Sequence, residues 1–461
     1  MGHHIPYTFG DIMKPITLKE IATSCNGQLV GDENAVVTSI VTDSRQVKQG
    51  SMFAAIKGER VDGHKFVAPC IDSGAVCALV EEKPQCECNY IMVESTLKAL
   101  KQIAKYYRST FDIPFIGITG SVGKTSTKEM ISSVLSQKFS VHKTQGNFNN
   151  ELGVPLTIFG LESHHEIAVI EMGISGFSEM TRLADIVRPD ISVITNIGYC
   201  HLENLIDLDG VLKAKTEMLE FLSNDGRMFF CGDDEKLFTV KEHNNVRTSF
   251  YGFDDRNDYK AQIINTDIEK GISCKLFLAN STVDAVVPSV ENHMVANALC
   301  AAAIGEYVGM TSEQIKDGIE SYKTVGSRSN VIRKNSITII DDCYNANPTS
   351  VRASINSLAK FDSRKVAIIG DMKELGTNEN SLHFDTGKYI IDAGIDEVIA
   401  VGTLCKHLFD GANHQGHYFE TVEQCIKEID SIVKNGDTVL VKASHSMHFE
   451  NIVDALKDKF D

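Results

Sequence analysis

The chain has 461 residues with 43% hydrophobic and 23% charged side chains, which suits a globular protein of about three domains. Its formal net charge of −17 argues against sequence-independent binding to nucleic acid or to an anionic membrane surface, both of which need a basic face. No apolar run reaches the ~18 residues of a membrane span and no signal-peptide pattern is present, so we expect a cytoplasmic protein with reduced cysteines.

The first segment, residues 1–112, mixes short strand-like runs with one longer helical stretch. The helix is expected over 96–108, and Ile113-Pro114 then marks a joint, because the residue before a proline is pushed out of helical geometry. We predict a small mixed α/β domain. Its strand-like runs are 36–41, 52–56, 78–80 and 90–93.

A glycine-rich loop opens the second segment, residues 113–325. It joins an apolar run to a helical pattern, which is the setting of a phosphate-binding loop. Lys124 can reach terminal phosphates and the Thr125 hydroxyl can ligate Mg²⁺. The spacing departs from the usual G-x-x-x-x-G-K-[ST], because Ile118 stands where the first glycine belongs, and a glycine turn without a nucleotide stays an alternative. The strand is expected over 115–118 and the helix over 128–135; the candidate nucleotide contacts are Gly120, Ser121, Val122, Gly123, Lys124, Thr125 and Ser126.

Two further runs of the second segment, 167–171 and 191–195, are nearly continuous in apolar β-formers. This pattern is typical of a parallel sheet covered on both faces and predicts a doubly wound α/β domain. Glu171 closes the first run, where we expect it to hold Mg²⁺, with capping of a following helix as the alternative. His201 follows the second run, and its role stays open between a metal ligand and an ordinary structural or solvated histidine. The segment continues with a β-rich stretch over 228–287 and a helix over 292–308.

The third segment, residues 326–461, again alternates strand-like runs with helical patterns. This order predicts a Rossmann-like α/β domain with ligands at the carboxyl ends of its strands. The strands are expected over 337–340, 366–369, 398–401 and 439–441, and the helices over 351–358, 382–393, 422–433 and 449–456.

Several runs together resemble the Mur ligases, the ATP-dependent amino-acid-adding enzymes of peptidoglycan precursor synthesis. The likeness covers nearly the whole chain, and the glycine spacing of the loop is the family's own form. The runs are 117–125, 146–155, Glu171-Met172-Gly173, His201 and the Ala214-Lys215 pair. Within the family, the likeness is closest to the members that add D-alanyl-D-alanine, because 341–348 and 370–376 look like their signatures and a D-N-P-R motif is absent.

The resemblance implies an enzyme that uses ATP and Mg²⁺ to join D-alanyl-D-alanine to a UDP-N-acetylmuramoyl-tripeptide through an acyl phosphate. It implies a monomer with small-molecule substrates and no nucleic-acid or membrane partner. It also implies that 1–112 binds the UDP-N-acetylmuramoyl-peptide, 113–325 binds ATP and 326–461 is the ligase domain. Ligands drawn from three domains require closure, so we expect the third to rotate.

The resemblance assigns the catalytic groups residue by residue. Lys124 neutralises phosphate charge, Thr125 and Glu171 hold a metal ion at the β- and γ-phosphates, and His201 holds one near the substrate carboxylate. Lys215 matches a lysine that the family carbamylates, which turns a repelled ammonium into an anion that can ligate Mg²⁺. Without the resemblance, a lysine on the helix expected over 209–219 could simply be solvated.

Further contacts are carried over in the same way. For the UDP-sugar residues, a plain turn or a surface charge is the alternative. Near the end of the chain His445 stands in place of the family's arginine, and for the adenine site Glu291 and Met294 depart from the family's pattern. The implied UDP-sugar contacts are Ser44, Arg45, Asp62, Gly63 and His64; Asn147, Asn345 and Asn347 are substrate contacts, the last two for the dipeptide; and His293, Asn297, Arg328 and Asp342 contact the nucleotide.

Two other interpretations remain open at this point. The chain could be a Mur-type ligase that adds a different residue, which the run 344–348 and the absent D-N-P-R disfavour. It could also be a nucleotide-binding regulatory protein that hydrolyses ATP without joining anything. Dependence of phosphate release on D-alanyl-D-alanine separates the two classes.

Overall fold

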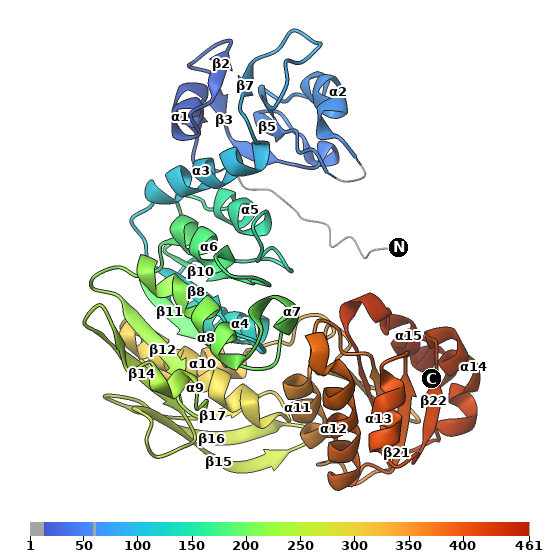
Figure 1. Cartoon of the computed structure of the whole chain (residues 1–461). Helices are drawn as coiled ribbons and strands as arrows, with labels where there is room; N and C mark the ends of the chain where they lie inside the picture. Colours follow the sequence, from blue (N-terminus) through green and yellow to red (C-terminus); the bar gives the residue numbers. More distant parts are fainter. Residues whose placement is uncertain (1–12, 59–60, 461) are drawn as a thin grey trace.

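The computed structural model describes residues 13–58 and 61–460. Within these ranges the strands form four sheets, arranged along the chain in three modules that Figure 1 colours blue, green to yellow, and orange to red. We call them the N-terminal (13–112), central (113–325) and C-terminal (326–460) modules, after the predicted ranges. Residues 1–12, 59–60 and 461 of those ranges lie outside the described residues.

The N-terminal module contains a five-stranded sheet in the order β2-β7-β6-β5-β4, parallel except for β2 against β7, and the small antiparallel pair β1-β3. Its strands are β1 (Ile16–Thr17), β2 (Gln28–Val30), β3 (Val36–Val37), β4 (Ser39–Val41), β5 (Ser51–Ala54), β6 (Cys77–Val80) and β7 (Tyr90–Met92), and its helices are α1 (Leu18–Ser24), α2 (Val67–Asp72) and α3 (Thr96–Ser109).

The strand predicted over 36–41 is two strands in two different sheets. Thr38 separates them: its N–H donates to the carbonyl of Gly50, and its carbonyl accepts from the N–H of Met13. Gly50 is required at this crossing, because its φ is +87° and a Cβ there would lie 2.4 Å from Thr38 Oγ1. The contact between Thr38 and Gly50 therefore lies where the pairing of β3 with β1 ends and the pairing of β4 with β5 begins.

The central module is built on a large, mostly parallel sheet in the order β17-β16-β15-β14-β12-β11-β8-β10-β9, with β13 on the edge of β14. The β-rich stretch predicted over 228–287 contains β12 to β17, of which β15 to β17 pair antiparallel. The strands are β8 (Phe115–Thr119), β9 (Val141–Lys143), β10 (Ile167–Glu171), β11 (Ile191–Ile194), β12 (Arg227–Cys231), β13 (Glu242–His243), β14 (Val246–Gly252), β15 (Tyr259–Asp267), β16 (Gly271–Phe277) and β17 (Thr282–Val287), and the helices are α4 (Lys124–Leu135), α5 (Gly153–Phe159), α6 (Glu179–Val187), α7 (Leu202–Leu205), α8 (Leu208–Thr216), α9 (Asn292–Tyr307) and α10 (Ser312–Glu320).

Both faces of the parallel part of the central sheet are covered at β8 and β10, as the continuous apolar runs predict. On β8 the side chain of Phe115 packs into one core and those of Ile116 and Ile118 into the core on the opposite face. β10 divides in the same way, with Ile170 on the first face and Val169 on the second. Alternate residues of a strand point to opposite faces. A strand that is covered on both faces is therefore apolar at nearly every position.

The C-terminal module has a six-stranded sheet in the order β18-β19-β23-β20-β21-β22, parallel except for β18 against β19. Helices α11, α12, α14 and α15 begin and end within a few residues of the predicted ranges, whereas α13 and the strands β18 and β22 were not predicted. The strands are β18 (Asn330–Arg333), β19 (Thr338–Asp341), β20 (Lys365–Gly370), β21 (Glu397–Val401), β22 (His417–Phe419) and β23 (Thr438–Lys442), and the helices are α11 (Pro348–Leu358), α12 (Glu379–Asp392), α13 (Cys405–Gly411), α14 (Val422–Ile432) and α15 (Glu450–Lys459).

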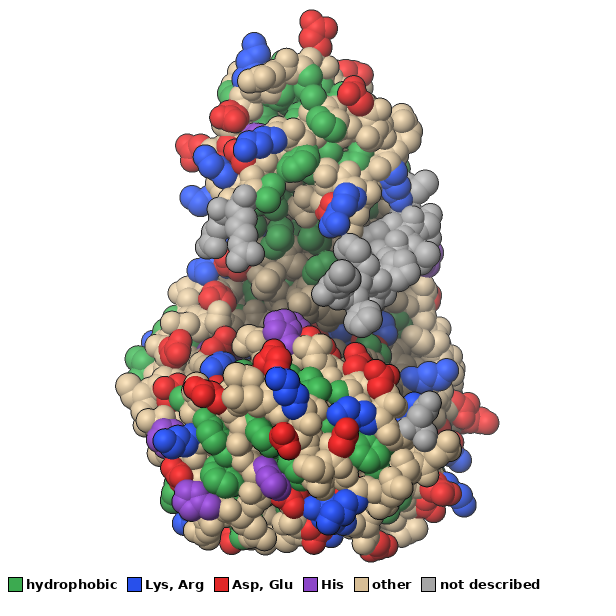
Figure 2. Space-filling view, turned by 90° about the vertical axis from the view of Figure 1, so that its right-hand side faces the viewer, with side chains coloured by type: hydrophobic (Ala, Val, Ile, Leu, Met, Phe, Trp, Pro, Cys, Tyr) green, Lys and Arg blue, Asp and Glu red, His purple; other side chains and the backbone are tan. Residues whose placement is uncertain are grey.

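The modules meet in two different ways. The N-terminal and central modules share one hydrophobic core through α3, in which Tyr107 is fully buried and its hydroxyl donates to the carbonyl of Leu161 at 2.6 Å. The central and C-terminal modules meet through an apolar contact, in which Val290 is buried in the core of the C-terminal module, and through polar contacts such as Lys360 Nζ to the carbonyl of Val290 at 2.7 Å. Figure 1 shows the N-terminal module standing apart from the C-terminal module, and Figure 2 shows the hollow between them.

Among the described residues, no helix has the length and apolar character needed to cross a membrane.

Candidate active site

The glycine-rich loop lies between β8 and α4, and α4 begins directly at Lys124. Gly120 has a φ of +152°, and a Cβ there would lie 1.9 Å from Thr195 Oγ1, so only glycine fits. Gly123 is left-handed at the N-cap of α4, whose first N–H groups have no partner within the helix. The end of β11 holds the loop, because the side-chain oxygen of Asn196 accepts the N–H of Val122 at 2.9 Å.

Lys124 folds back over the loop, where its Nζ donates to the carbonyl of Gly120 at 2.8 Å. Burial lowers the pKa of Lys124, because its charge has left water for a less polarisable environment. An anion with terminal phosphate groups placed over this loop would meet that charge and the N-terminus of α4 together.

Glu171 lies at the carboxyl end of β10, buried to 1% exposure. The Thr125 hydroxyl donates to its Oε2 at 2.9 Å, and the Asn149 amide donates to its Oε1 at 2.8 Å. The arrangement brings a hydroxyl and a carboxylate, both suitable ligands for a hard cation, next to the glycine-rich loop.

His201 reaches the same site from the N-terminal end of α7. Its Nδ1 lies 2.6 Å from Glu374 Oε2 of the C-terminal module, and the Leu202 N–H donates to the carbonyl of Glu374 at 3.1 Å. The hydrogen bond from His201 lowers the pKa of the Glu374 carboxyl. His201 therefore joins the central and C-terminal modules at the edge of the site.

Lys215 lies on α8 behind the phosphate loop and is 1% exposed. Its Nζ donates to the carbonyl of Gly120 at 3.1 Å, so Gly120 accepts from both Lys124 and Lys215. Within the described residues no carboxylate forms an ion pair with it. Burial lowers the pKa of Lys215 to about 8, because the charged ammonium loses its contact with water.

A pocket of about 390 Å³ brings most of the predicted residues together, and its walls come from the central and C-terminal modules. Of the predicted site, it is lined by Ser121, Val122, Gly123, Lys124, Thr125, Ser126, Glu171, His201, His293, Arg328, Asp342, Asn345 and Asn347.

The C-terminal wall of the pocket is held by a buried ion pair. Lys442 Nζ lies 2.5 Å from Asp342 Oδ2 and also donates to the carbonyl of Asn345 at 3.0 Å. Arg328 stacks over the ring of Tyr344 at 3.7 Å, and the Tyr344 ring lies 5.6 Å from that of His445. The side-chain oxygen of Asn347 accepts the N–H of Ser350 and so caps α11, which leaves its amide group for a ligand.

Four predicted residues of the central module do not line the pocket: Lys215, which lies behind it, and Gly120, Asn147 and Asn297. Gly120 is the first residue of the loop, directly after β8, and Asn297 Oδ1 accepts from the Thr127 hydroxyl at 3.1 Å. Asn147 is exposed, whereas Asn149, two residues further along the same loop, reaches Glu171.

The predicted UDP-sugar contacts lie in the N-terminal module, away from this pocket. Arg45 is paired with Asp43, with Nη2 2.6 Å from Oδ2. His64 Nδ1 lies 2.7 Å from Asp62 Oδ1, and its Nε2 accepts the Glu81 N–H at 2.9 Å. Gly63 packs against the backbone of Ile56. A Cβ added at position 63 would lie only 2.8 Å from the Ile56 nitrogen.

Several residues of the site were not predicted as site residues from the sequence. Asn149 and Glu374 lie inside the runs 146–155 and 370–376, but spacing does not distinguish them from their neighbours. Lys442 is the first residue of the family run 442–447, in which only His445 was singled out from the sequence. Glu291, which departs from the family's pattern, lines the pocket and accepts from the Ser329 hydroxyl at 2.7 Å.

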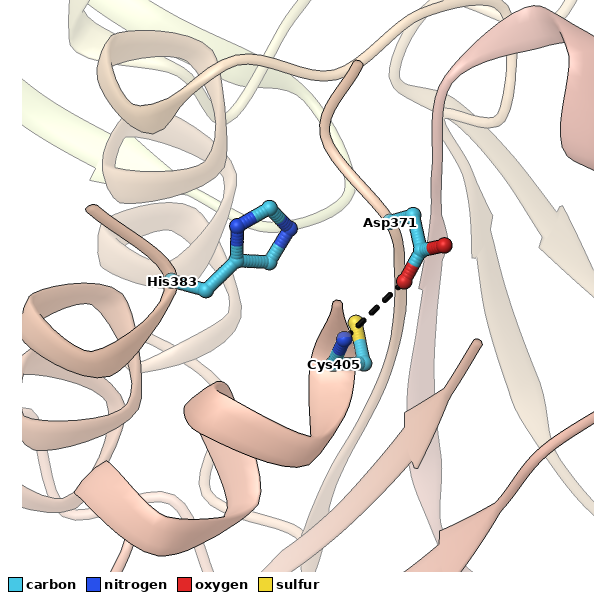
Figure 3. Close-up of side chains that lie close together, drawn as sticks. All are labelled: Asp371, His383 and Cys405. Carbon is cyan, nitrogen blue, oxygen red and sulfur yellow. Dashed lines mark hydrogen bonds between the residues drawn. The ribbon is translucent and has the colours of Figure 1, made fainter. Parts of the chain in front are cut away.

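Asp371, His383 and Cys405 form a buried cluster in the C-terminal module (Figure 3). Asp371 Oδ1 accepts the N–H of Cys405 at 2.9 Å, and both ring nitrogens of His383 are used, Nε2 by the Met372 N–H and Nδ1 by the Glu379 carbonyl. The histidine therefore offers no free lone pair to a metal ion. The cluster instead holds the segment after β20, which includes Met372 and places Glu374 in contact with His201.

The chain matches three family models in succession. The model described as "Mur ligase family, catalytic domain" matches residues 36–108, "Mur ligase middle domain" matches 118–305, and "Mur ligase, glutamate ligase domain" matches 327–445.

Curated relatives and solved structures agree with these matches. The UDP-N-acetylmuramoyl-tripeptide--D-alanyl-D-alanine ligase of Bacillus subtilis is 37% identical over 95% of this chain and 97% of its own, and that of Escherichia coli is 32% identical over 97% and 99%. The crystal structure of MurF from Acinetobacter baumannii superposes with a TM-score of 0.91 at 30% identity, covering 97% of this chain and 100% of that one. MurF ligase from Thermotoga maritima in complex with ADP gives a TM-score of 0.82 at 28% identity, covering 92% and 97%.

Proposed function

Because the chain belongs to the Mur ligase family, we propose that it is the ATP-dependent ligase that joins D-alanyl-D-alanine to UDP-N-acetylmuramoyl-tripeptide. It works on soluble small molecules in the cytoplasm, as a monomer. The observation that carries the proposal is that two modules line one pocket. The central module contributes the glycine-rich loop, Glu171 and His201, and the C-terminal module contributes Asp342, Asn345 and Asn347.

The chemistry explains why two modules must meet at one site. A carboxylate is a poor electrophile, so the terminal carboxylate of the tripeptide first takes the γ-phosphoryl group of ATP and becomes an acyl phosphate. The amine of D-alanyl-D-alanine then attacks the acyl carbon, and phosphate leaves from the tetrahedral intermediate. Each step gathers negative charge, which Lys124 and the N-terminus of α4 offset.

The residues around Glu171 fit a magnesium ion. They supply a buried carboxylate and a hydroxyl that already contact one another, with the His201 imidazole on the adjacent loop. Thr125, Glu171 and His201 would hold the ion or ions, together with Lys215 if it is carbamylated. Bound Mg²⁺ would neutralise charge on the phosphates and orient them for transfer.

The remaining contacts follow the division into modules. His293, Asn297 and Arg328 serve the nucleotide, and Asn345 and Asn347 serve the ends of the dipeptide through their amide groups. Ser44, Arg45, Asp62, Gly63 and His64 serve the UDP-sugar from the N-terminal module, and Asn147 lies on the loop facing the same substrate. The UDP-sugar end and the reacting carboxylate are thereby bound by different modules.

Phosphate release by the purified full-length chain tests the proposal. With ATP, Mg²⁺ and UDP-N-acetylmuramoyl-tripeptide, release should depend strictly on added D-alanyl-D-alanine, and one pentapeptide product should form per phosphate. L-alanyl-L-alanine at the same concentration is the matched control and should give background release. Release that proceeds equally without the dipeptide would support a nucleotide-hydrolysing regulatory protein instead, and release that requires a single free amino acid would point to a different Mur-type ligase.

A further inference from the structure

A fully buried lysine lies directly behind the carboxylate of Glu171. Lys128 is on α4, one turn beyond Lys124, and has no exposed surface. Its Nζ donates to the carbonyl of Thr144 at 2.6 Å and lies 3.1 Å from Glu129 Oε1 and 3.8 Å from Glu171 Oε2. Residues four apart share a face of a helix, so α4 presents one lysine to the pocket and a second one deeper in the molecule.

Stability alone does not account for this arrangement. Removing a lysine from water costs several kcal/mol, and hydrophobic replacements of buried ion pairs are often neutral or stabilising. Lys128 nevertheless contacts oxygens from three separate places: α4 itself, the turn after β9 and the end of β10. A buried charge connected in this way fixes the relative positions of its partners.

Glu171 is the partner whose orientation matters to the site. Asn149 donates to Oε1, Thr125 donates to Oε2, and Lys128 lies on the Oε2 side from within the protein. The Glu171 N–H donates to the Thr144 hydroxyl at 2.9 Å, and the carbonyl of Thr144 is the one that Lys128 holds. The carboxylate and the backbone that carries it therefore depend on the same lysine.

We propose that Lys128 is a positioning residue that holds the Glu171 carboxylate in the direction of the nucleotide-bound divalent cation. The inference rests on the proposed function above. Without Lys128, the carboxylates of Glu129 and Glu171 lose the cation that both of them contact, and Glu171 can turn away from the pocket. Metal ligands are commonly oriented by such partners beyond the first contact.

Lys143 provides the matched control. It lies on β9 and pairs with Glu129 Oε2, and its side chain is 31% exposed. Among the described residues it has no ion pair with Glu171. Replacing Lys143 removes a cation from the same acidic cluster without touching the proposed ligand.

The test is binding of Mn²⁺ to the full-length chain with saturating ADP, followed by electron paramagnetic resonance, in wild type, Lys128→Met, Lys128→Gln and Lys143→Gln. The Lys128→Gln variant retains a donor for the Thr144 carbonyl. It is included in case the Lys128→Met variant does not fold. Both Lys128 variants should bind Mn²⁺ about 10- to 100-fold more weakly, the loss typical of removing a partner of a metal ligand. Binding of ADP without metal should stay as in wild type, and Lys143→Gln should bind Mn²⁺ as wild type does.

Two results would overturn the inference. Wild-type Mn²⁺ affinity in a Lys128 variant with a lowered melting temperature would assign the lysine to the fold alone, and so would failure of both Lys128 variants to fold. Absence of Mn²⁺ binding to wild type with ADP is a different result, because it would remove the proposed function and this inference with it.

Discussion

At the scale of single residues, burial turns ordinary lysines into specialised groups. Lys215 is enclosed behind the phosphate loop and has a backbone carbonyl as its hydrogen-bond partner. Lys124 and Lys215 both donate to the carbonyl of Gly120. This places two positive charges unusually close together at the glycine-rich loop. A carbamate on Lys215 would reverse one of these charges and supply oxygens suited to Mg²⁺.

We expect Lys215→Ala to lower turnover by about 10²- to 10³-fold, the loss typical of removing one group that stabilises developing charge. Acetate or formate at millimolar concentration should restore part of the activity, because a small carboxylate can occupy the space of the lost carbamate. Initial rates of phosphate release in the presence of D-alanyl-D-alanine measure both effects.

The control for this variant is Lys213→Ala, because Lys213 is an exposed lysine of the same helix. It should retain the wild-type rate and show no response to acetate. Full activity of Lys215→Ala would exclude a carbamate at this position.

At the scale of elements, the start of α11 combines a structural role with a proposed binding role. The Asn347 side chain and Ser350 form a capping box, with Pro348 as the first residue of the helix. This cap fixes the turn that carries Asn345 and Asn347 at the carboxyl end of β19. The helix start and the proposed dipeptide contact therefore share one side chain, and a substitution can separate them.

Asn347→Asp should leave the free energy of unfolding within about 0.5 kcal/mol of wild type, because aspartate is an equally good N-cap. The same variant should raise the KM for D-alanyl-D-alanine, because the amide donor facing the dipeptide has become an anionic oxygen. Urea unfolding and steady-state kinetics are the two measurements.

Two alanine variants complete the comparison. Asn347→Ala should lose about 1 kcal/mol of stability and raise the KM as well, whereas Thr421→Ala, which removes the capping box of α14, should lose a similar amount with no change in KM. A wild-type KM in Asn347→Asp would limit Asn347 to capping the helix.

At the scale of the whole molecule, the two junctions between modules have different stiffness. A shared hydrophobic core joins the N-terminal and central modules, and close-packed cores deform little. The junction to the C-terminal module combines a small apolar contact at Val290 with polar contacts such as His201 with Glu374 and Ser329 with Glu291. We therefore expect residues 13–325 to move as one body and the C-terminal module to rotate against it.

Small-angle X-ray scattering should show a smaller radius of gyration when a non-hydrolysable ATP analogue and UDP-N-acetylmuramoyl-tripeptide are both bound. We expect the hollow between the N-terminal and C-terminal modules to close in that state, because the substrate carboxylate must reach the glycine-rich loop (Figure 2). Each ligand alone serves as the control and should give a smaller change. Scattering that is identical with and without both ligands would contradict closure.

The sequence by itself determined the α/β architecture and the phosphate loop. Apolar runs such as 115–118 and 167–171 and the glycine-rich spacing of 117–125 are local patterns, so both can be found without coordinates. Tertiary structure decided which side chains meet. Asn149 with Glu171, Lys128 with Glu171, and His201 with Glu374 are contacts between residues 22, 43 and 173 positions apart along the chain. Such pairs arise only when parallel strands bring their carboxyl ends to one edge and a second module folds against it, and no local pattern encodes that approach.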